Sequence, residues 1–351
     1  MKKIYLLISI LVFASMVLAA CQPATQVATE APTSAPVVTE APTEAPVVTE
    51  APTEAPAVTE APTEAPAATE APTAAPATDL GTEDNPIVWV LVPSQDTQTV
   101  LSGADEIAAA IEDETGLVVK PLVTTDYTGA VEAMCSGEAQ IGALNTFNYV
   151  LAHERGCADV ALASERFGST FYQGQIITQK DSGINSIADL AGKTFCRPDP
   201  TSTSGWIIPS IDMRAAGIDP EKDLGEIVDA GGHDAVVISV YNGDCDAGAT
   251  FVDARTNVEK DFPDVMDKVV VVSTSVNIPN DTISFTPSLP SDVRDQIVNV
   301  FLDLTKTDKG LETLNTVYSW SGVQPVEDSF YDGFRQQLEA AGMNIEDLVN
   351  P

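Results

Sequence analysis

Five consecutive ten-residue repeats occupy residues 29–78, and they decide which part of this chain is able to fold. Each repeat carries proline at two fixed places, in variations of the sequence TEAPTEAPVV. Because proline removes a backbone donor and biases its neighbours toward extended conformations, no packed core forms from this pattern. We therefore expect residues 21–80 to be a disordered, Thr/Glu/Pro-rich tether and the fold to begin after it.

The N-terminus has the features of an export signal. Lys2 and Lys3 precede an almost wholly apolar run over residues 4–17, and the sequence LAAC follows at residues 18–21. This pattern is typical of a bacterial lipoprotein signal peptide, and the apolar run is shorter than the roughly 20 residues that span a bilayer. We expect residues 1–20 to be cleaved, Cys21 to be lipidated, and the protein to lie on the outer face of the cytoplasmic membrane.

The chain is strongly acidic. It has 17 Lys and Arg residues against 52 Asp and Glu residues, a formal net charge of -35. Nucleic acid and anionic lipid surfaces are recognised through positive patches, so this charge argues against both as partners.

After residue 86, short apolar segments alternate with amphipathic ones, which predicts an α/β fold with mainly parallel sheets covered by helices. Two extended segments, residues 171–178 and 278–285, bracket a complete α/β unit. We therefore expect the chain to cross twice between two lobes, with a ligand cleft between them. Residues 81–174 and 281–351 are assigned to lobe 1, and residues 175–280 to lobe 2. Nothing in the sequence requires self-association, and a monomer is expected.

Four further cysteines, an even number, predict disulfides in an exported chain. They are Cys135, Cys157, Cys196 and Cys245. Three pairings are possible, and we favour Cys135 with Cys157 and Cys196 with Cys245 because each then closes within one lobe. A metal site is disfavoured, because there is no CxxC motif and the two histidines have no ligand spacing. No cofactor is expected.

Two loops of the second unit combine polar groups with the start of a helix. DPTSTSG (199–205) joins a strand to a helix, and GGHD (231–234) opens the next helix. Hydroxyls and free N–H groups at a helix N-terminus suit an oxyanion, aided by the helix dipole. Each motif taken alone also fits an ordinary helix cap.

Taken together, the motifs resemble the phosphonate and phosphite branch of the substrate-binding proteins of ABC importers, which have the two-lobed, type II periplasmic-binding-protein fold. The resemblance spans about residues 86–339. It is carried by DYTGAVEAMCSGEAQIGAL (126–144), STFYQGQIIT (169–178), DLAGKTF (189–195), DPTSTSGWIIP (199–209), GGHDAVVISVYNGDCDAGATF (231–251) and IPNDTISF (278–285).

The resemblance implies a role for eight residues. Ser202, Thr203 and Ser204 match the hydroxyl cluster around the phosphonate oxygens, with His233 as a further donor. Tyr127 and Tyr172 match aromatic contacts to the head group, and Asp281 matches a carboxylate that accepts from a protonated ligand oxygen. Asp253 matches an acid that pairs with a ligand amine, although Asp stands where the family carries Glu, so the organic substituent stays open.

The resemblance implies a solute receptor that delivers a phosphonate, phosphite or phosphate to a membrane permease. A hydrolase built on Ser202 or Ser204 with His233 and Asp253 is disfavoured, because no GxSxG turn is present. The alternatives that stay open are a sensory lipoprotein and a receptor of the same fold for another solute, such as a sulfonate or a pyrimidine.

Overall fold

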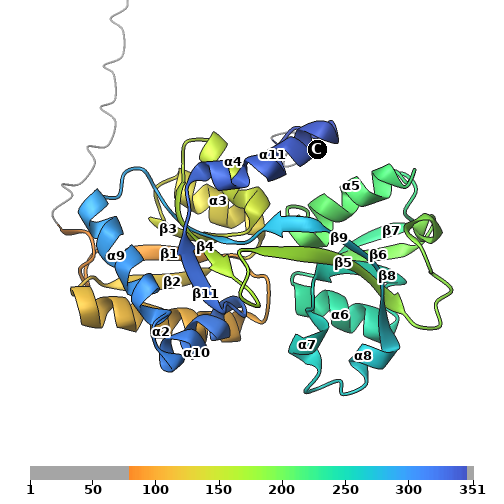
Figure 1. Ribbon diagram of the computed structural model, residues 1–351, viewed down its shortest axis with the longest axis horizontal. Helices are drawn as coiled ribbons and strands as arrows, with labels where there is room; N and C mark the ends of the chain where they lie inside the picture. Colours follow the sequence, from red (N-terminus) through yellow and green to blue (C-terminus); the bar gives the residue numbers. More distant parts are fainter. Residues whose placement is uncertain (1–78, 346–351) are drawn as a thin grey trace, which may run out of the picture. The chain divides into compact units, whose positions relative to one another are not determined.

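The computed structural model describes residues 79–345, which form two α/β lobes, each built on one sheet (Figure 1). The predicted signal peptide, the lipid site Cys21 and the repeats lie outside the described residues. No helix between residues 79 and 345 is long and apolar enough to cross a membrane.

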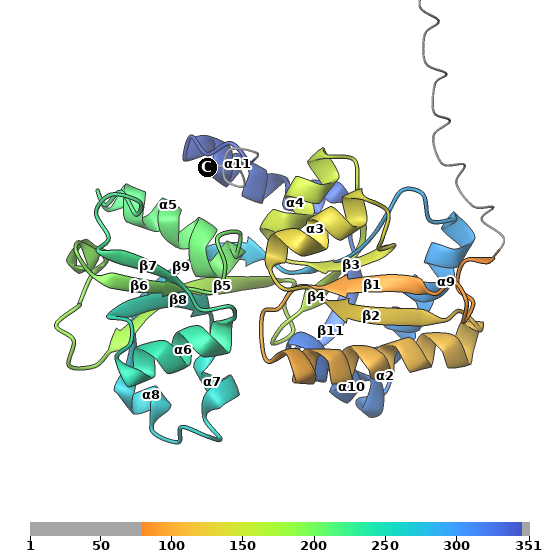
Figure 2. The ribbon, with the colours of Figure 1, turned by 180° about the vertical axis from the view of Figure 1, so that it is seen from behind.

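Lobe 1 is built on a six-stranded sheet with the order β11-β4-β10-β3-β1-β2. Its strands are β1 (Ile87–Leu91), β2 (Val119–Val123), β3 (Ile141–Leu144), β4 (Asp159–Glu165), β10 (Thr282–Phe285) and β11 (Gly322–Pro325). Its helices are α2 (Thr97–Thr115), α3 (Tyr127–Cys135), α4 (Thr146–Glu154), α9 (Ser291–Leu304), α10 (Asp308–Tyr318), η4 (Asp328–Tyr331) and α11 (Asp332–Ala340). Helices α3 and α4 cover one face of the sheet, and α2 and α10 cover the other (Figure 2).

Lobe 2 is built on a five-stranded sheet with the order β7-β6-β8-β5-β9. Its strands are β5 (Phe171–Gln179), β6 (Thr194–Arg197), β7 (Glu226–Asp229), β8 (Ala247–Phe251) and β9 (Val269–Pro279). Its helices are η2 (Ile187–Leu190), η3 (Thr203–Ile207), α5 (Ile208–Ala215), α6 (His233–Asn242), α7 (Arg255–Val258) and α8 (Val265–Lys268). Helix α5 lies on one face of this sheet, and α6, α7 and α8 lie on the other (Figures 1 and 2).

Helix α2 illustrates how local sequence sets these elements. Asp96 caps it by accepting from the Thr99 amide at 2.9 Å, so the helix begins at Thr97. Gly116, at φ 74°, ends the helix in the left-handed conformation that glycine adopts without a Cβ clash. The buried face recurs at helical spacing, with Val100, Ala104, Ile107, Ala108 and Ile111, and it packs toward the core of the lobe.

The sheets are mixed, which corrects the prediction of mainly parallel sheets. Strand β1 pairs in parallel with β2 and β3, and β6 pairs in parallel with β7 and β8. The strands next to the crossovers reverse this: β10 is antiparallel to β3 and β4, and β5 is antiparallel to β8 and β9. A strand that enters its lobe through a crossover, as β5 and β10 do, starts from the opposite end of the sheet to the parallel strands. Its direction is therefore reversed.

The chain passes between the lobes twice, between β4 and β5 and again between β9 and β10. The second predicted extended segment, residues 278–285, is divided between the end of β9 and the whole of β10. The residues around these two crossovers therefore lie beside the interface of the lobes, where a ligand cleft is expected.

Both predicted disulfides are present. Cys135–Cys157 joins the end of α3 to the loop after α4, and Cys196–Cys245 joins β6 to the loop before β8. Each closes a loop inside one lobe, so the favoured pairing is confirmed.

Candidate functional site

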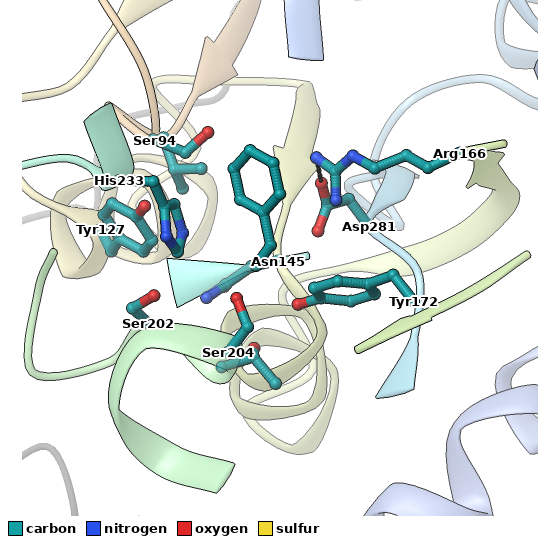
Figure 3. A pocket seen from close by; sticks show the side chains of 12 residues that line it. Ser94, Tyr127, Asn145, Arg166, Tyr172, Ser202, Ser204, His233 and Asp281 are labelled. Carbon is teal, nitrogen blue, oxygen red and sulfur yellow. Dashed lines mark hydrogen bonds and ion pairs between the residues drawn. The ribbon is translucent and has the colours of Figure 1, made fainter. Parts of the chain in front are cut away.

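A small cavity lies where the two lobes meet (Figure 3). Lobe 1 contributes Val92, Ser94, Tyr127 and Asn145, the two crossovers contribute Arg166 and Asp281, and lobe 2 contributes Tyr172, Ser202, Thr203, Ser204, His233 and Phe251. Seven of the eight residues proposed from the sequence as ligand contacts therefore line one cavity, and Asp253 does not.

The cavity is compact. Its volume, counted as the space open to the centre of a water-sized sphere, is about 20 Å³. A sphere of that volume has a radius of about 1.7 Å, and adding the radius of the water-sized sphere, about 1.4 Å, gives room for a body about 3 Å in radius. This is about the size of a tetrahedral oxyanion such as phosphate.

The hydroxyl cluster stands at the start of a helix that enters the cavity. Ser202 caps η3: its Oγ accepts from the Gly205 amide at 3.2 Å, and its carbonyl oxygen accepts from the Trp206 and Ile207 amides. Thr203 and Ser204 follow the cap directly, where amides have no acceptor one helical turn back, so their N–H groups are available to an anion. Gly205 is required here, because a Cβ would lie 2.3 Å from Pro198 Cδ.

His233 opens α6 and is tied to both lobes. Its amide donates to the Ser94 carbonyl at 2.9 Å, and its Nδ1 lies 2.8 Å from Thr250 Oγ1. Burial, together with the nearby positive charge of Arg166, lowers the pKa of His233 to about 3. The ring is therefore neutral at ordinary pH, and Nε2 is the nitrogen left for a ligand.

Tyr127 and Tyr172 are both buried at the cavity. The Tyr127 hydroxyl is buried and has no hydrogen-bond partner within the described part of the chain. Burial, followed by the charge of Asp199, raises the pKa of Tyr127 well above its ordinary value, and burial likewise raises the pKa of Tyr172. Both phenols are thus neutral and able to donate, and the unsatisfied Tyr127 hydroxyl is the sign of a missing acceptor.

Arg166 is the lining residue that sequence reasoning missed. It is the only Lys or Arg among the residues found to line this cavity, and its side chain is 4% exposed. Nη2 donates to Asp281 Oδ2 at 2.7 Å, while Nε and Nη1 donate to the Tyr318 carbonyl and to Asn280 Oδ1. The two loop motifs, residues 199–205 and 231–234, contain no Lys or Arg, yet the fold brings a guanidinium group to the Asp281 carboxylate.

Asp253 is engaged elsewhere. Its Oδ1 accepts from Gln175 Nε2 at 3.0 Å, and Arg255 donates from Nε to Oδ1 and from Nη2 to Oδ2, at 2.8 and 2.5 Å. Although burial raises it, these hydrogen bonds hold the pKa of Asp253 below its ordinary value. The carboxylate is ionised and already paired, and it is not among the groups that face the cavity.

Hydrogen bonds also join the two lobes around the cavity. Asn145 Nδ2 donates to the Thr201 carbonyl at 3.0 Å, and the Phe147 amide donates to Thr203 Oγ1 at 2.9 Å. Thr203 therefore acts as an acceptor between the lobes as well as lining the cavity. Among residues 79–345, no group of three or more His, Cys, Asp or Glu side chains is arranged to hold a metal ion.

Residues 89–331 match the sequence profile of the periplasmic substrate-binding protein of phosphonate ABC transporters. This chain belongs to that family. Members of this phosphonate-binding family are solute-binding components of ABC transporters and not enzymes, so the family assignment and the binding role predicted from the sequence are both confirmed.

Two curated relatives are similar in sequence. The phosphate-import protein PhnD of Mycolicibacterium smegmatis is 28% identical over 279 residues, which cover 73% of this chain and 86% of that protein. The phosphonates-binding periplasmic protein of Escherichia coli K12 is 27% identical over 202 residues, which cover 56% of this chain and 60% of that protein.

Solved structures show the fold. A binding-protein component of an ABC phosphonate transporter from Pseudomonas aeruginosa is 21% identical, with a TM-score of 0.68 over 73% of this chain and 86% of that one. PhnD1 of Prochlorococcus marinus, solved in complex with methylphosphonate, is 16% identical, with a TM-score of 0.66 over 74% of this chain and 98% of that one. The two-lobed periplasmic-binding-protein fold predicted from the sequence is confirmed.

Proposed function

We propose that this chain is the lipid-anchored, extracytoplasmic binding protein of an ABC importer and that it captures a phosphonate, phosphite or phosphate anion between its lobes for delivery to the membrane permease. The observation that carries the proposal is the convergence of donors on a cavity of oxyanion size. The start of η3, the neutral ring of His233 and the unsatisfied hydroxyl of Tyr127 surround this cavity.

The electrostatics of these donors suit an anion in an otherwise acidic protein. Hydroxyl and amide donors stabilise oxyanions through fixed dipoles, and such hydrogen bonds are strong because the acceptor is charged. The net charge of -35 slows the approach of an anion, so binding energy comes from the cavity itself.

Calorimetric titration of the purified full-length chain tests the ligand class. Methylphosphonate, phosphite and phosphate are titrated separately, with sulfate as the comparison anion, and Ser204→Ala is measured beside the wild type. We expect tight binding of at least one phosphorus anion, weakened about 10-fold or more in Ser204→Ala because a hydrogen bond to a charged group is lost. Absence of binding to every phosphorus anion would refute the proposed function. Tight sulfate binding would favour the alternative of a different solute.

Anchoring and transport are tested on living cells. We propose that Cys21 carries the lipid and that residues 21–80 are the tether, and Cys21→Ser removes the acyl acceptor without touching residues 79–345. Labelled palmitate is expected to enter the wild-type chain and not Cys21→Ser, which is released to the medium. Loss of phosphonate uptake on release supports delivery to a permease. Normal uptake with the released chain, or the absence of any effect of deletion, would favour the sensory alternative.

A further inference from the structure

Arg166 and Asp281 form a buried ion pair in the wall of the cavity. In Figure 3, Arg166, Asp281 and Tyr172 lie on one side of the cavity, and Tyr127, His233 and Ser202 lie on the opposite side. The guanidinium carbon lies 5.4 Å from the centre of the Tyr172 ring and 5.2 Å from that of Phe251. These aromatic faces and the carboxylate hold the guanidinium group in place.

The guanidinium group of Arg166 has more N–H donors than its three hydrogen bonds to the protein use. Arginine has five N–H donors, and three of them are directed at Tyr318, Asn280 and Asp281. Nη1 and Nη2 each carry a second N–H, and Arg166 lines the cavity. A ligand oxygen on this side would therefore meet a positively charged donor.

The same arrangement leaves no place for a cationic tail. The two carboxylates that a ligand amine would seek are both paired, Asp281 with Arg166 at 2.7 Å and Asp253 with Arg255 and Gln175. An ammonium group beside Asp281 would also face the charge of Arg166, and like charges at short range in a buried site repel strongly. The cavity has room for a body about 3 Å in radius, which is about the size of the oxyanion alone.

We propose that Arg166 contacts the ligand and determines its specificity. Because Asp253 is paired outside the cavity, Arg166 restricts the pocket to compact, tailless phosphorus oxyanions and excludes aminoalkylphosphonates. Because Arg166 cancels the charge of Asp281, a doubly charged ligand meets a lining with no net charge. This inference rests on the proposed function and names the subset of phosphorus anions that the site accepts.

The wild-type, full-length chain is titrated by calorimetry with phosphite, phosphate, methylphosphonate and 2-aminoethylphosphonate. We expect at least one of the first three to bind about 10-fold or more tightly than the amine-bearing compound. Binding of none of the four refutes the proposed function itself. Binding of 2-aminoethylphosphonate as tightly as the best compact anion leaves the function in place and overturns this inference.

The double variant R166Q/D281N distinguishes a contact between Arg166 and the ligand from a purely structural pairing of Arg166 with Asp281. It removes both charges together, so the net charge of the lining is unchanged and no buried charge is left alone. If Arg166 donates to the ligand, the double variant binds the compact anion about 10- to 100-fold more weakly and discriminates less against the amine. If Arg166 only balances Asp281, affinity and discrimination stay at the wild-type level, which overturns the proposal.

Arg197→Gln is the matched control. Arg197 is also paired with an aspartate, Asp229, and lies 4.4 Å from the centre of the Trp206 ring, but it does not line the cavity. The loss of Arg197 is expected to leave the affinities for the compact anion and for the amine unchanged.

If the double variant R166Q/D281N does not fold, Arg166→Lys is measured in its place. Lysine keeps the charge beside Asp281 but loses the planar fork, so the compact anion is expected to bind about 3- to 10-fold more weakly while the amine stays excluded. Unchanged affinity for the compact anion, or admission of the amine, contradicts the proposal.

Discussion

The backbone amide of Tyr127, in lobe 1, donates to the carboxylate Oδ2 of Asp199, in lobe 2, at 3.1 Å. The other oxygen, Oδ1, accepts from the amide and hydroxyl of Thr201 at 2.7 and 2.8 Å, so this one side chain shapes the hydroxyl loop and joins it to the opposite lobe. Burial raises the pKa of Asp199, against the lowering effect of these hydrogen bonds. The contact exists only while the lobes are together, which is also the arrangement that encloses the cavity.

Replacing Asp199 by Asn should therefore weaken ligand binding more than it weakens folding. The amide nitrogen of Asn cannot accept from Tyr127, so one hydrogen bond to a charged group between the lobes is lost. We expect roughly a 10-fold loss of affinity for the best-binding phosphorus anion by calorimetry. Asp246→Asn is the control, because Asp246 Oδ2 accepts from the Thr194 amide inside lobe 2. An equal loss of affinity in both variants would contradict the interpretation.

Gly174 supports the hydroxyl cluster from behind. It lies on β5, and a Cβ at this position would lie 2.9 Å from the carbonyl oxygen of Ser204. We expect Gly174→Ala to push the start of η3 out of place, lowering affinity about 10-fold and the free energy of unfolding by about 1–3 kcal/mol.

Gly333→Ala is the control for Gly174→Ala. Gly333 lies on α11, and a Cβ there would meet nothing within 4 Å. This variant should keep full affinity and gain up to about 1 kcal/mol of stability, since alanine favours a helix over glycine. Wild-type affinity in Gly174→Ala would show that the cluster tolerates displacement. Calorimetry and urea unfolding give the two quantities.

Sequence motifs indicated which residues lie together wherever those residues are close in the chain. Ser202, Ser204 and His233 belong to strand–loop–helix motifs in which the helix start and the polar groups are adjacent in the chain, and the structure places them at one cavity. Arg166 could not be found this way, because its partner Asp281 is 115 residues further along. The available signal was a lone arginine beside the first predicted crossover, in a chain with only 17 basic residues.

The fold, like the site, was predictable from the sequence only where it depends on local patterns. Strand–helix alternation predicted two α/β lobes, but strand direction depends on how the chain re-enters each sheet, which periodicity does not encode. Strand β11 (Gly322–Pro325) is too short for its sequence to predict a strand, and it ends in proline, which suits its place at the sheet edge beside β4. Asp253 was assigned as a partner of a ligand amine because of its position in the sequence. In the structure it pairs instead with Arg255, two residues further along the chain.

The two disulfides should differ in their contribution to stability. Cys135–Cys157 closes 22 residues and Cys196–Cys245 closes 49, so the chain-entropy estimate gives about 3 and about 4 kcal/mol. Double Cys→Ser variants are compared by urea unfolding, and removal of Cys196–Cys245 is expected to cost more. The reverse order would mean that native packing around the cysteines outweighs loop entropy.

The buried, neutral His233 makes stability depend on pH. Its pKa is lowered from 6.5 to about 3 in the folded chain, so between these values the unfolded chain binds a proton that the folded chain does not. Stability is therefore lost as the pH falls through this window. Between pH 7 and pH 5, the wild type should lose about 2 kcal/mol more than His233→Gln in urea unfolding. Parallel curves for the two proteins would mean that the folded and unfolded chains protonate this ring over the same pH range, which contradicts a lowered pKa of His233.

Tyr127 and Tyr318 provide a test of which buried hydroxyl serves the ligand. The Tyr318 hydroxyl donates to the Val92 carbonyl at 2.6 Å, whereas the Tyr127 hydroxyl has no partner within residues 79–345. Removing an unsatisfied hydroxyl costs the fold nothing, so Tyr127→Phe should keep or slightly raise stability and lose about 10-fold in affinity. Tyr318→Phe should lose about 1 kcal/mol of stability, because it removes a buried hydrogen bond to the Val92 carbonyl, which then keeps only the Ser94 amide as a donor, and it should affect affinity less. If Tyr127→Phe instead unfolds more easily and binds normally, its hydroxyl serves the core and not the ligand.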